Sequence, residues 1–223
     1  MKQEQFLNLA SAEEALKKFR DAVNPAPLGE EQILLKEARG RVLSRDVIAS
    51  INVPYYDRSN FDGYAVRAED TFGAEETEPL SLKLNREILA CGVIPEEQLL
   101  PGTATPISTG GVLPRGADGV VMIENTHPDG DRIRVLKPIV PGGGVSLAGS
   151  DLGAGEVVLR RGDLLSFRET GTLAAVGETH VWVWKKPKVS VVSTGDELIA
   201  PGEPMQLGRV YDSNSLVVGH AAE

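Results

Sequence analysis

Residues 53–67 read Val-Pro-Tyr-Tyr-Asp-Arg-Ser-Asn-Phe-Asp-Gly-Tyr-Ala-Val-Arg, and at this stretch the chain changes character. From here to about residue 144, short runs of β-forming residues alternate with turns rich in Gly, Pro and Asp. The runs cover residues 64–66, 80–84, 120–123 and 132–135. This alternation predicts a compact, barrel-like β domain over residues 52–144.

The segments on either side of this domain belong together. Residues 32–51 have strand composition around a short helical turn. After a glycine-rich hinge at residues 141–144, the chain returns to strands and then to a helix at residues 166–176. We therefore expect a mixed α/β linker domain over residues 28–51 and 145–184, into which the β domain is inserted.

A helix is predicted near the N-terminus. Ser11 can cap it, and Glu14 three residues later completes a capping box. Apolar residues then recur at helical spacing. They are Ala12, Ala15, Leu16, Phe19 and Val23. Residues 1–27 are expected to hold this helix, packed on the linker domain or on the C-terminal part.

The C-terminal part, residues 185–223, has a different sequence pattern from the two regions before it. Residues 189–193 read Val-Ser-Val-Val-Ser, as expected for a strand buried on both faces of a parallel sheet. Residues 209–211 suggest a second strand, and Asp212 begins a set of residues that can cap a helix. A parallel sheet needs several strand–helix crossovers. Residues 185–223 are therefore expected to begin a truncated α/β domain, poorly ordered or packed on another copy, and the fold class is multidomain α+β.

The composition describes a folded protein and excludes several classes of function. Of 223 residues, 24 are Gly and 14 are Pro, which favours turns over long helices. The net charge is −9 at pH 7 without a long basic cluster, which argues against nucleic acid as a partner. No apolar run is long enough for a membrane span, and no secretory leader follows Met1. Because Cys91 is the single cysteine, no intramolecular disulfide can form, and we expect a cytoplasmic protein.

Three polar stretches could carry chemistry. The loop at 53–67 is either a site or a set of turn formers and surface charges. Residues 101–111, rich in hydroxyls and glycine, either surround an oxyanion or form a polar connection between strands. Residues 193–198 follow the predicted parallel strand, where open α/β sheets bind ligands, or they form a turn in which an acid satisfies nearby N–H groups.

The side chains available favour carboxylate chemistry. The three histidines have no ligand spacing, and there is no nucleophile elbow and no dinucleotide fingerprint, so zinc sites, acyl-transfer triads and nicotinamide chemistry have little support. Carboxylates from several loops could jointly hold Mg²⁺ together with substrate phosphates. Such an ion would let an acidic protein bind an anionic ligand.

Four blocks occur in order along the chain. They are Asn-Phe-Asp-Gly-Tyr-Ala-Val-Arg at 60–67, the Gly-Thr-Ala to Val-Val region at 102–121, Lys-Val to Asp-Glu-Leu at 188–198, and Tyr-Asp-Ser-Asn at 211–214. Together they resemble the molybdopterin molybdenumtransferase family, whose human relative is the C-terminal region of gephyrin.

The resemblance implies an enzyme of molybdenum cofactor biosynthesis. Such an enzyme inserts molybdate into adenylylated molybdopterin and releases AMP, with Mg²⁺ assisting. The resemblance also implies an elongated homodimer whose site lies between the α/β domain of one subunit and the β domain of the other. Molybdopterin adenylyltransferase would be the upstream partner.

The functional positions of the family carry over residue by residue. Asp62, Asp151 and Glu197 match catalytic positions, and Asp62 and Glu197 would also position the cation. The positions that would bind substrate are Thr103, Thr109, Gly195 and Asp196.

The chain also departs from the family pattern. Pro106 stands where members often carry a basic residue, and Ser150 replaces a frequent Glu beside Asp151. The α/β domain of the family continues well past the position of Glu223, so an N-terminal fragment is expected. The alternatives are a non-catalytic dimerisation or scaffold module of the gephyrin type and a generic Mg²⁺-dependent phosphohydrolase.

Overall fold

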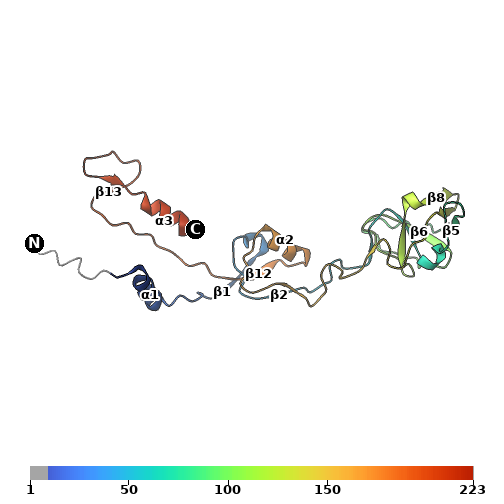
Figure 1. Ribbon diagram of the computed structural model, residues 1–223, viewed down its shortest axis with the longest axis horizontal. Coiled ribbons are helices and arrows are strands. Elements are labelled where there is room, and N and C mark those ends of the chain that lie inside the picture. The colour runs from blue at the N-terminus through green and yellow to red at the C-terminus, as the bar shows by residue number, and fades with distance from the viewer. Residues whose placement is uncertain (1–9, 223) are drawn as a thin grey trace, which may run out of the picture. The chain divides into compact units, whose positions relative to one another are not determined.

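The computed structural model describes residues 10–222 and divides the chain into two compact units. The larger unit is Gln32–Val183, and the smaller one combines the residues before Gln32 with those from Trp184 onward. Figure 1 follows the elements along the chain. The fold is mixed α/β with few helices, and the largest sheet, of six strands, lies in the larger unit.

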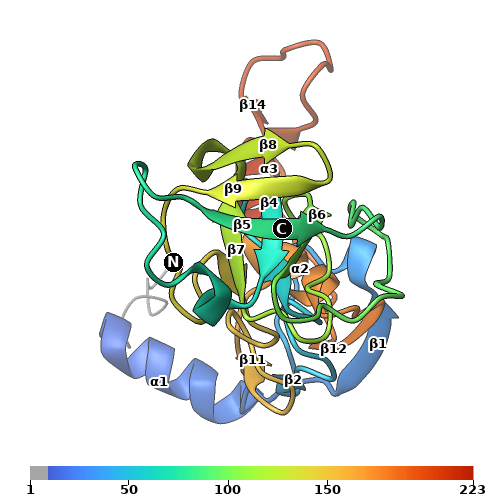
Figure 2. The same cartoon turned by 90° about the vertical axis from the view of Figure 1, so that its right-hand side faces the viewer.

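This sheet has six strands in the order β7-β4-β6-β5-β9-β8 and curls as half a barrel. Neighbouring strands are antiparallel except for β5 and β6, which are parallel. Figure 2 shows β8, β9 and β5 side by side. The strands are β4 (Gly63–Val66), β5 (Leu80–Leu84), β6 (Thr103–Ile107), β7 (Gly119–Met122), β8 (Thr126–Asp129) and β9 (Arg132–Val135). The 3₁₀ turns η2 (Ala68–Thr71) and η3 (Ile123–Asn125) follow β4 and β7.

The four strands predicted between residues 64 and 135 are confirmed, and β5 and β9 have the predicted bounds. Strands β6 and β8 were not predicted. The first occupies the hydroxyl-rich stretch that was expected to be a connection or an oxyanion cradle. It forms a strand because Ala104, Thr105 and Ile107 bury their side chains there, and threonine suits a pleated, half-buried surface.

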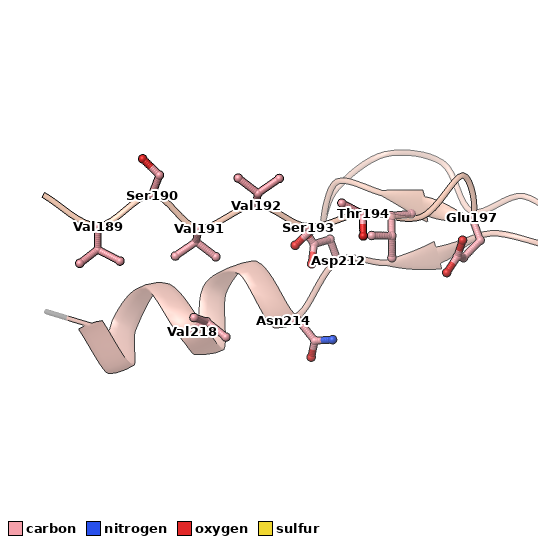
Figure 3. A pocket seen from close by; sticks show the side chains of 11 residues that line it. Val189, Ser190, Val191, Val192, Ser193, Thr194, Glu197, Asp212, Asn214 and Val218 are labelled. Atoms are coloured by element: carbon pink, nitrogen blue, oxygen red, sulfur yellow. The ribbon is translucent and has the colours of Figure 1, made fainter. Parts of the chain in front are cut away.

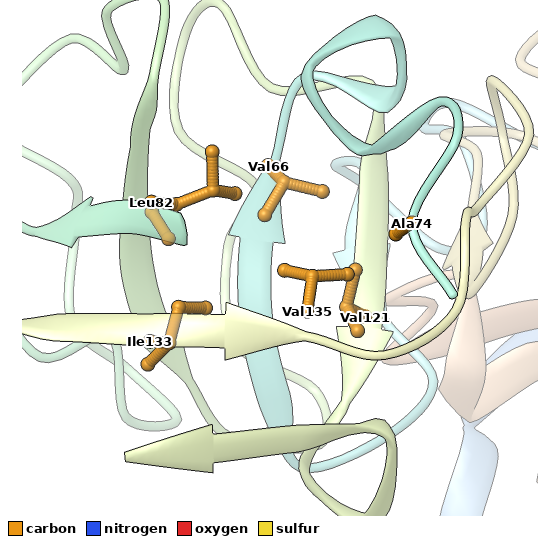
Figure 4. Packing of buried hydrophobic residues seen from close by; sticks show 7 residues of the cluster. Val66, Ala74, Leu82, Val121, Ile133 and Val135 are labelled. Carbon is orange, nitrogen blue, oxygen red and sulfur yellow. The ribbon is translucent and has the colours of Figure 1, made fainter. Parts of the chain in front are cut away.

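Two apolar clusters hold the sheet together. In β9, Ile133 and Val135 are buried while Arg132 and Arg134, which alternate with them, are exposed, as the two-residue period of a strand requires. The first cluster, shown in Figure 4, consists of Val66, Ala74, Leu82, Ala104, Val121, Ile133 and Val135. The second consists of Ala65, Leu89, Ile107 and Val120. Because Ala65 and Val66 are adjacent, β4 contributes one side chain to each cluster.

A second α/β region lies outside the sheet. Strand β1 (Glu30–Leu34) pairs with β12 (His180–Trp184), and β2 (Val47–Ile48) pairs with β11 (Val157–Leu159). The 3₁₀ turn η1 (Leu35–Glu37) precedes Gly40, as predicted. Helix α2 (Phe167–Ala175) buries Leu173 in a core that also contains Leu43, Leu165 and Val183. The predicted helix at 166–176 is confirmed.

An antiparallel ladder joins these two regions. Strand β3 (Arg58–Ser59) pairs with β10 (Val145–Ser146), and farther along Val53 is bridged to Leu152. The Asp57 carboxylate reinforces the ladder by accepting a hydrogen bond from the Ala148 N–H at 2.7 Å.

The smaller unit contains α1 (Ala12–Val23), the parallel pair β13 (Leu198–Ile199) and β14 (Val210–Tyr211), and α3 (Asn214–Ala222). The predicted capping box of α1 is confirmed, because Ser11 accepts from the Glu14 N–H and Glu14 accepts from the Ser11 N–H. No residue of α1 is buried, and its packing on the linker domain or the C-terminal part stays a prediction.

One sequence prediction in the smaller unit is wrong. Residues 189–193 were expected to form a strand buried on both faces, but they belong to no strand, and Val192 is 79% exposed. Valines favour a strand only where neighbours cover the pleated surface, and within residues 10–222 no strand pairs with this segment. The second predicted strand and the following helix are confirmed as β14 and α3.

The boundaries predicted for the domains, at residues 27, 51, 144 and 184, stay predictions. None of the helices within residues 10–222 is both long enough and apolar enough to cross a membrane.

Candidate functional site

Asp62 and Thr109 form a pair at one end of the six-stranded sheet. Asp62 directly precedes β4, and Thr109 follows β6 by two residues. One carboxylate oxygen of Asp62, Oδ1, accepts hydrogen bonds from the Thr109 N–H at 2.7 Å and from the Thr109 hydroxyl at 3.1 Å. Both residues are exposed, so the pair presents a fixed carboxylate to solvent.

The register of β4 explains why the pair forms. Gly63 lies opposite Ile107 in β6 and opposite Met122 in β7. A Cβ atom on Gly63 would lie 2.0 Å from the Val121 carbonyl oxygen, so only glycine allows this approach. The backbone oxygen of Asp62 also accepts from the Ile123 N–H at 3.1 Å. The close packing at Gly63 therefore fixes the residue just before it.

The Thr109 side of the pair is also held. The Cys91 thiol lies 2.9 Å from the Thr109 carbonyl oxygen and donates to it. Gly110 follows with φ +79, a conformation that favours glycine. Thr109 is thus held at its N–H by Asp62 and at its carbonyl by Cys91.

Thr103 is not brought to this pair. It begins β6, whose five residues span about 13 Å, and Thr109 lies beyond the opposite end. The Thr103 hydroxyl donates to the Leu100 carbonyl at 2.7 Å and accepts from the Leu100 N–H at 3.2 Å. Its hydrogen bonds therefore close a local turn.

Asp151 also lies apart from Asp62. Its backbone N–H donates to the Val53 carbonyl at 3.0 Å, in the ladder outside the sheet, and its carboxylate accepts from the Ser150 hydroxyl at 3.4 Å. Asp151 is exposed, and eight residues of chain lie between Val53 and Asp62. Within residues 10–222, the Asp62 carboxylate is bonded to Thr109 and the Asp151 carboxylate to Ser150, and no hydrogen-bond partner is shared by the two carboxylates.

The smaller unit has a polar pocket of its own, of about 470 Å³. Figure 3 shows the extended segment 189–194 above α3, with Asp212 and Glu197 toward one end. The pocket is lined by Val189, Ser190, Val191, Val192, Ser193, Thr194, Glu197, Leu198, Asp212, Asn214 and Val218. Glu197 is thus a pocket residue, and Gly195 and Asp196 lie in the adjoining turn.

Backbone contacts fix the segment that carries Glu197. The Glu197 carbonyl accepts from the Val210 N–H at 2.9 Å, and the Arg209 guanidinium donates to the Asp196 carbonyl. Gly195 has φ +155, and a Cβ there would lie 2.7 Å from Oε2 of Glu197. Glycine at 195 therefore leaves room for the Glu197 carboxylate.

Asp212 is a pocket residue that the sequence placed in a helix cap and in the block at 211–214, but not among the candidate site residues. Its carboxylate accepts from the Ser215 N–H at 3.0 Å, which confirms the cap. Hydrogen bonds from the Ser215 backbone and the Ser193 hydroxyl lower the pKa of Asp212 below its usual value. Its position directly after a strand was the available signal that it also faces a ligand pocket.

The donor set suits Mg²⁺ only in part. Within residues 10–222, no three His, Cys, Asp or Glu side chains lie close enough together to hold a metal ion. Glu197 and Asp212 supply two carboxylates to one pocket, and Mg²⁺ is usually bound by one or two carboxylates plus water and substrate phosphates. Either carboxylate could serve as one ligand of such an ion, with the remaining ligands from water and a phosphate-bearing substrate.

Residues 10–177 match a family model described as the MoeA N-terminal region, domains I and II. Molybdopterin molybdenumtransferase 2 of Mycobacterium tuberculosis is 39% identical over 187 residues, which cover 84% of this chain and 46% of that protein. Molybdopterin molybdenumtransferase of Nostoc is 39% identical, with 82% and 42% covered. A crystal structure of the molybdopterin biosynthesis MoeA protein of Pyrococcus horikoshii aligns with a TM-score of 0.86 and 38% identity, over 96% of this chain and 57% of that one. The chain spans about half the length of the relatives it matches.

Proposed function

The chain belongs to the MoeA N-terminal region family, and from this premise we propose that it acts in molybdenum cofactor biosynthesis as the N-terminal part of a molybdopterin molybdenumtransferase. The substrates are molybdate and adenylylated molybdopterin, and the products are AMP and molybdopterin carrying the metal. Mg²⁺ assists, and the reaction takes place in the cytoplasm. Molybdopterin adenylyltransferase supplies the adenylylated substrate.

The reaction breaks the phosphoanhydride bond of an anionic substrate. Mg²⁺, when bound, offsets the negative charge of the phosphates. Glu197 and Asp212 would supply carboxylate ligands to such a cation in this pocket, and Gly195 and Asp196 lie in the turn beside Glu197. Asp62 would orient water or a hydrated cation through its second carboxylate oxygen, since Oδ1 accepts both hydrogen bonds from Thr109. Asp151 contributes from the ladder in the assembled enzyme.

The observation that carries the proposal is the Asp62–Thr109 pair. Two donors on one oxygen, and a neighbouring glycine that tolerates no Cβ, hold the Asp62 carboxylate in one position at the surface. Electrostatic preorganisation of this kind is typical of sites that act on charged groups. Thr109, and not Thr103, is the threonine that belongs with Asp62.

AMP release tests the proposal. The 223-residue chain and a version extended to the length of the relatives are each given adenylylated molybdopterin and Mg²⁺, with and without molybdate. We expect molybdate-dependent AMP release from the extended version and little from the shorter chain. The matched Asp62→Asn variant of the extended version should release AMP at least about tenfold more slowly, because a neutral amide replaces the negative charge of the Asp62 carboxylate.

Two other results would overturn the proposal. Release from neither version would favour the scaffold module of the gephyrin type. Hydrolysis of ordinary nucleotides without any need for molybdate would favour a generic phosphohydrolase. We also propose a homodimer, which sedimentation equilibrium of both versions tests, and a monomer in both would contradict it.

A further inference from the structure

Ser59 is a buried hydroxyl that the proposed reaction does not use. It ends β3 and is 1% exposed, although it lies only three residues before the exposed Asp62. Its hydroxyl donates to the Phe61 carbonyl at 2.6 Å and accepts from the Phe61 N–H at 3.2 Å. The Ser59 hydroxyl therefore bonds both backbone groups of Phe61, the residue that directly precedes Asp62.

The backbone of Ser59 holds the opposite side of the pair. Its carbonyl accepts from the Gly110 N–H at 2.8 Å, and its N–H donates to the Gly111 carbonyl at 3.0 Å. Gly110 directly follows Thr109. One residue is thus bonded to both of the chain segments that carry Asp62 and Thr109.

We propose that Ser59 is a positioning residue that sets the Asp62 carboxylate against the Thr109 N–H and hydroxyl. This inference rests on the proposed function, because it assigns Ser59 a role in the same site. Loss of the Ser59 hydroxyl leaves the Phe61 N–H and carbonyl without this partner. Residues 59–62 then change conformation, and the Asp62 carboxylate loses its hydrogen bonds with the Thr109 N–H and hydroxyl.

Thr71 provides a matched control. Its hydroxyl is also fully buried, and it also bonds backbone groups, donating to the Ala68 carbonyl at 2.7 Å and accepting from the Ile139 N–H at 3.0 Å. It lies in η2, which follows the end of β4 opposite to Asp62. Thr71→Val removes this hydroxyl at nearly constant volume and should leave the pair intact.

The first test measures the pair directly in the 223-residue chain, without reference to activity. In Ser59→Ala, the Thr109 amide should exchange with solvent at least about tenfold faster than in the unchanged chain, and in Thr71→Val it should not. Ser59→Thr keeps the hydroxyl and should keep the Thr109 amide protected. Equal exchange in Ser59→Ala and the unchanged chain, or an unfolded Ser59→Ala beside a folded Thr71→Val, would overturn the inference.

The second test measures molybdate insertion by the extended version. Ser59→Ala should lower kcat at least about tenfold with little change in KM, since misplacement of a group costs more in the transition state than in binding. Thr71→Val should leave both constants unchanged. If Asp62→Ala abolishes insertion but Ser59→Ala does not affect it, the inference on Ser59 fails and the proposed function stands. If Asp62→Ala has no effect, the proposed function fails.

Discussion

Asp62 and Thr109 lie 47 residues apart in the sequence and meet through two hydrogen bonds. Both residues could be singled out from the sequence, because the blocks that contain them are rich in acids, hydroxyls and glycine. Their contact could not be predicted, since it depends on the register of β4 against β6, and a shift of one residue would move every side chain to the other face. The same register places Thr103 at the far end of β6.

The two threonines therefore make a matched pair of substitutions in the extended version. Thr109→Val removes a hydroxyl donor from a carboxylate, and we expect insertion to fall about tenfold with the fold intact. Thr103→Val removes a turn bond to Leu100, so it should lower the melting temperature by a few degrees and leave insertion unchanged. Initial rates and thermal unfolding of both variants check this. The reverse pattern would place the functional hydroxyl at Thr103.

At the scale of elements, the sequence predicted well wherever local signals decide the structure. A capping box marked the start of α1, and alternating residues marked β9 with its bounds. Strand β6 was missed because hydroxyls and Pro106 dilute its apolar pattern, although proline is tolerated at a position where no ladder bond from its nitrogen is needed. Residues 189–193 show the opposite error, since a strong local preference for strand meets no partner among residues 10–222.

The capping box of α2 predicts a dependence of stability on pH. Hydrogen bonds from the Ser166 hydroxyl and from backbone N–H groups lower the pKa of Glu169 below its usual value of 4.5. The ionised carboxylate therefore stabilises the folded state fully at pH values above 4.5, and this contribution is lost as the pH falls through the lower, folded pKa. Glu169→Gln should melt below the unchanged chain at neutral pH, and the difference should shrink as the pH falls through the folded pKa.

Fluorescence of Trp182 in β12, which belongs to the same α/β region, can follow this melting. Ser166→Ala, which removes the cap itself, should destabilise by about 1 kcal/mol at neutral pH. A difference between Glu169→Gln and the unchanged chain that persisted undiminished in acid would show that the Glu169 charge is not responsible.

At the scale of the whole molecule, the sequence blocks pointed to one family, and the match over residues 10–177 bears this out. The candidate residues nevertheless fall into separate places. Asp62 and Thr109 lie at an end of the sheet, Asp151 lies on the ladder, and Glu197 lies in the pocket of the smaller unit. A linear sequence orders these residues but carries no information on which of them converge, because convergence depends on packing between elements far apart in the chain.

The exposed valines of the smaller unit carry the last prediction. Val189 is 59% exposed and Val192 is 79% exposed, and the backbone of this segment belongs to no strand in the described part of the chain. Without the hydrogen bonds of a strand, its amides have nothing to protect them from solvent.

In the 223-residue chain, we expect the amides of residues 189–193 to exchange at close to the rates of an unfolded peptide, while those of β5 and β9 stay protected as an internal reference. In a version extended to the length of the relatives, further strands can pair with the segment and cover its side chains, so the same amides should slow by at least about a hundredfold. Mass spectrometry of exchanged peptides measures both chains side by side. Strong protection of residues 189–193 in an isolated monomer of the shorter chain would contradict the prediction, because the segment would then have to find its cover within these residues alone.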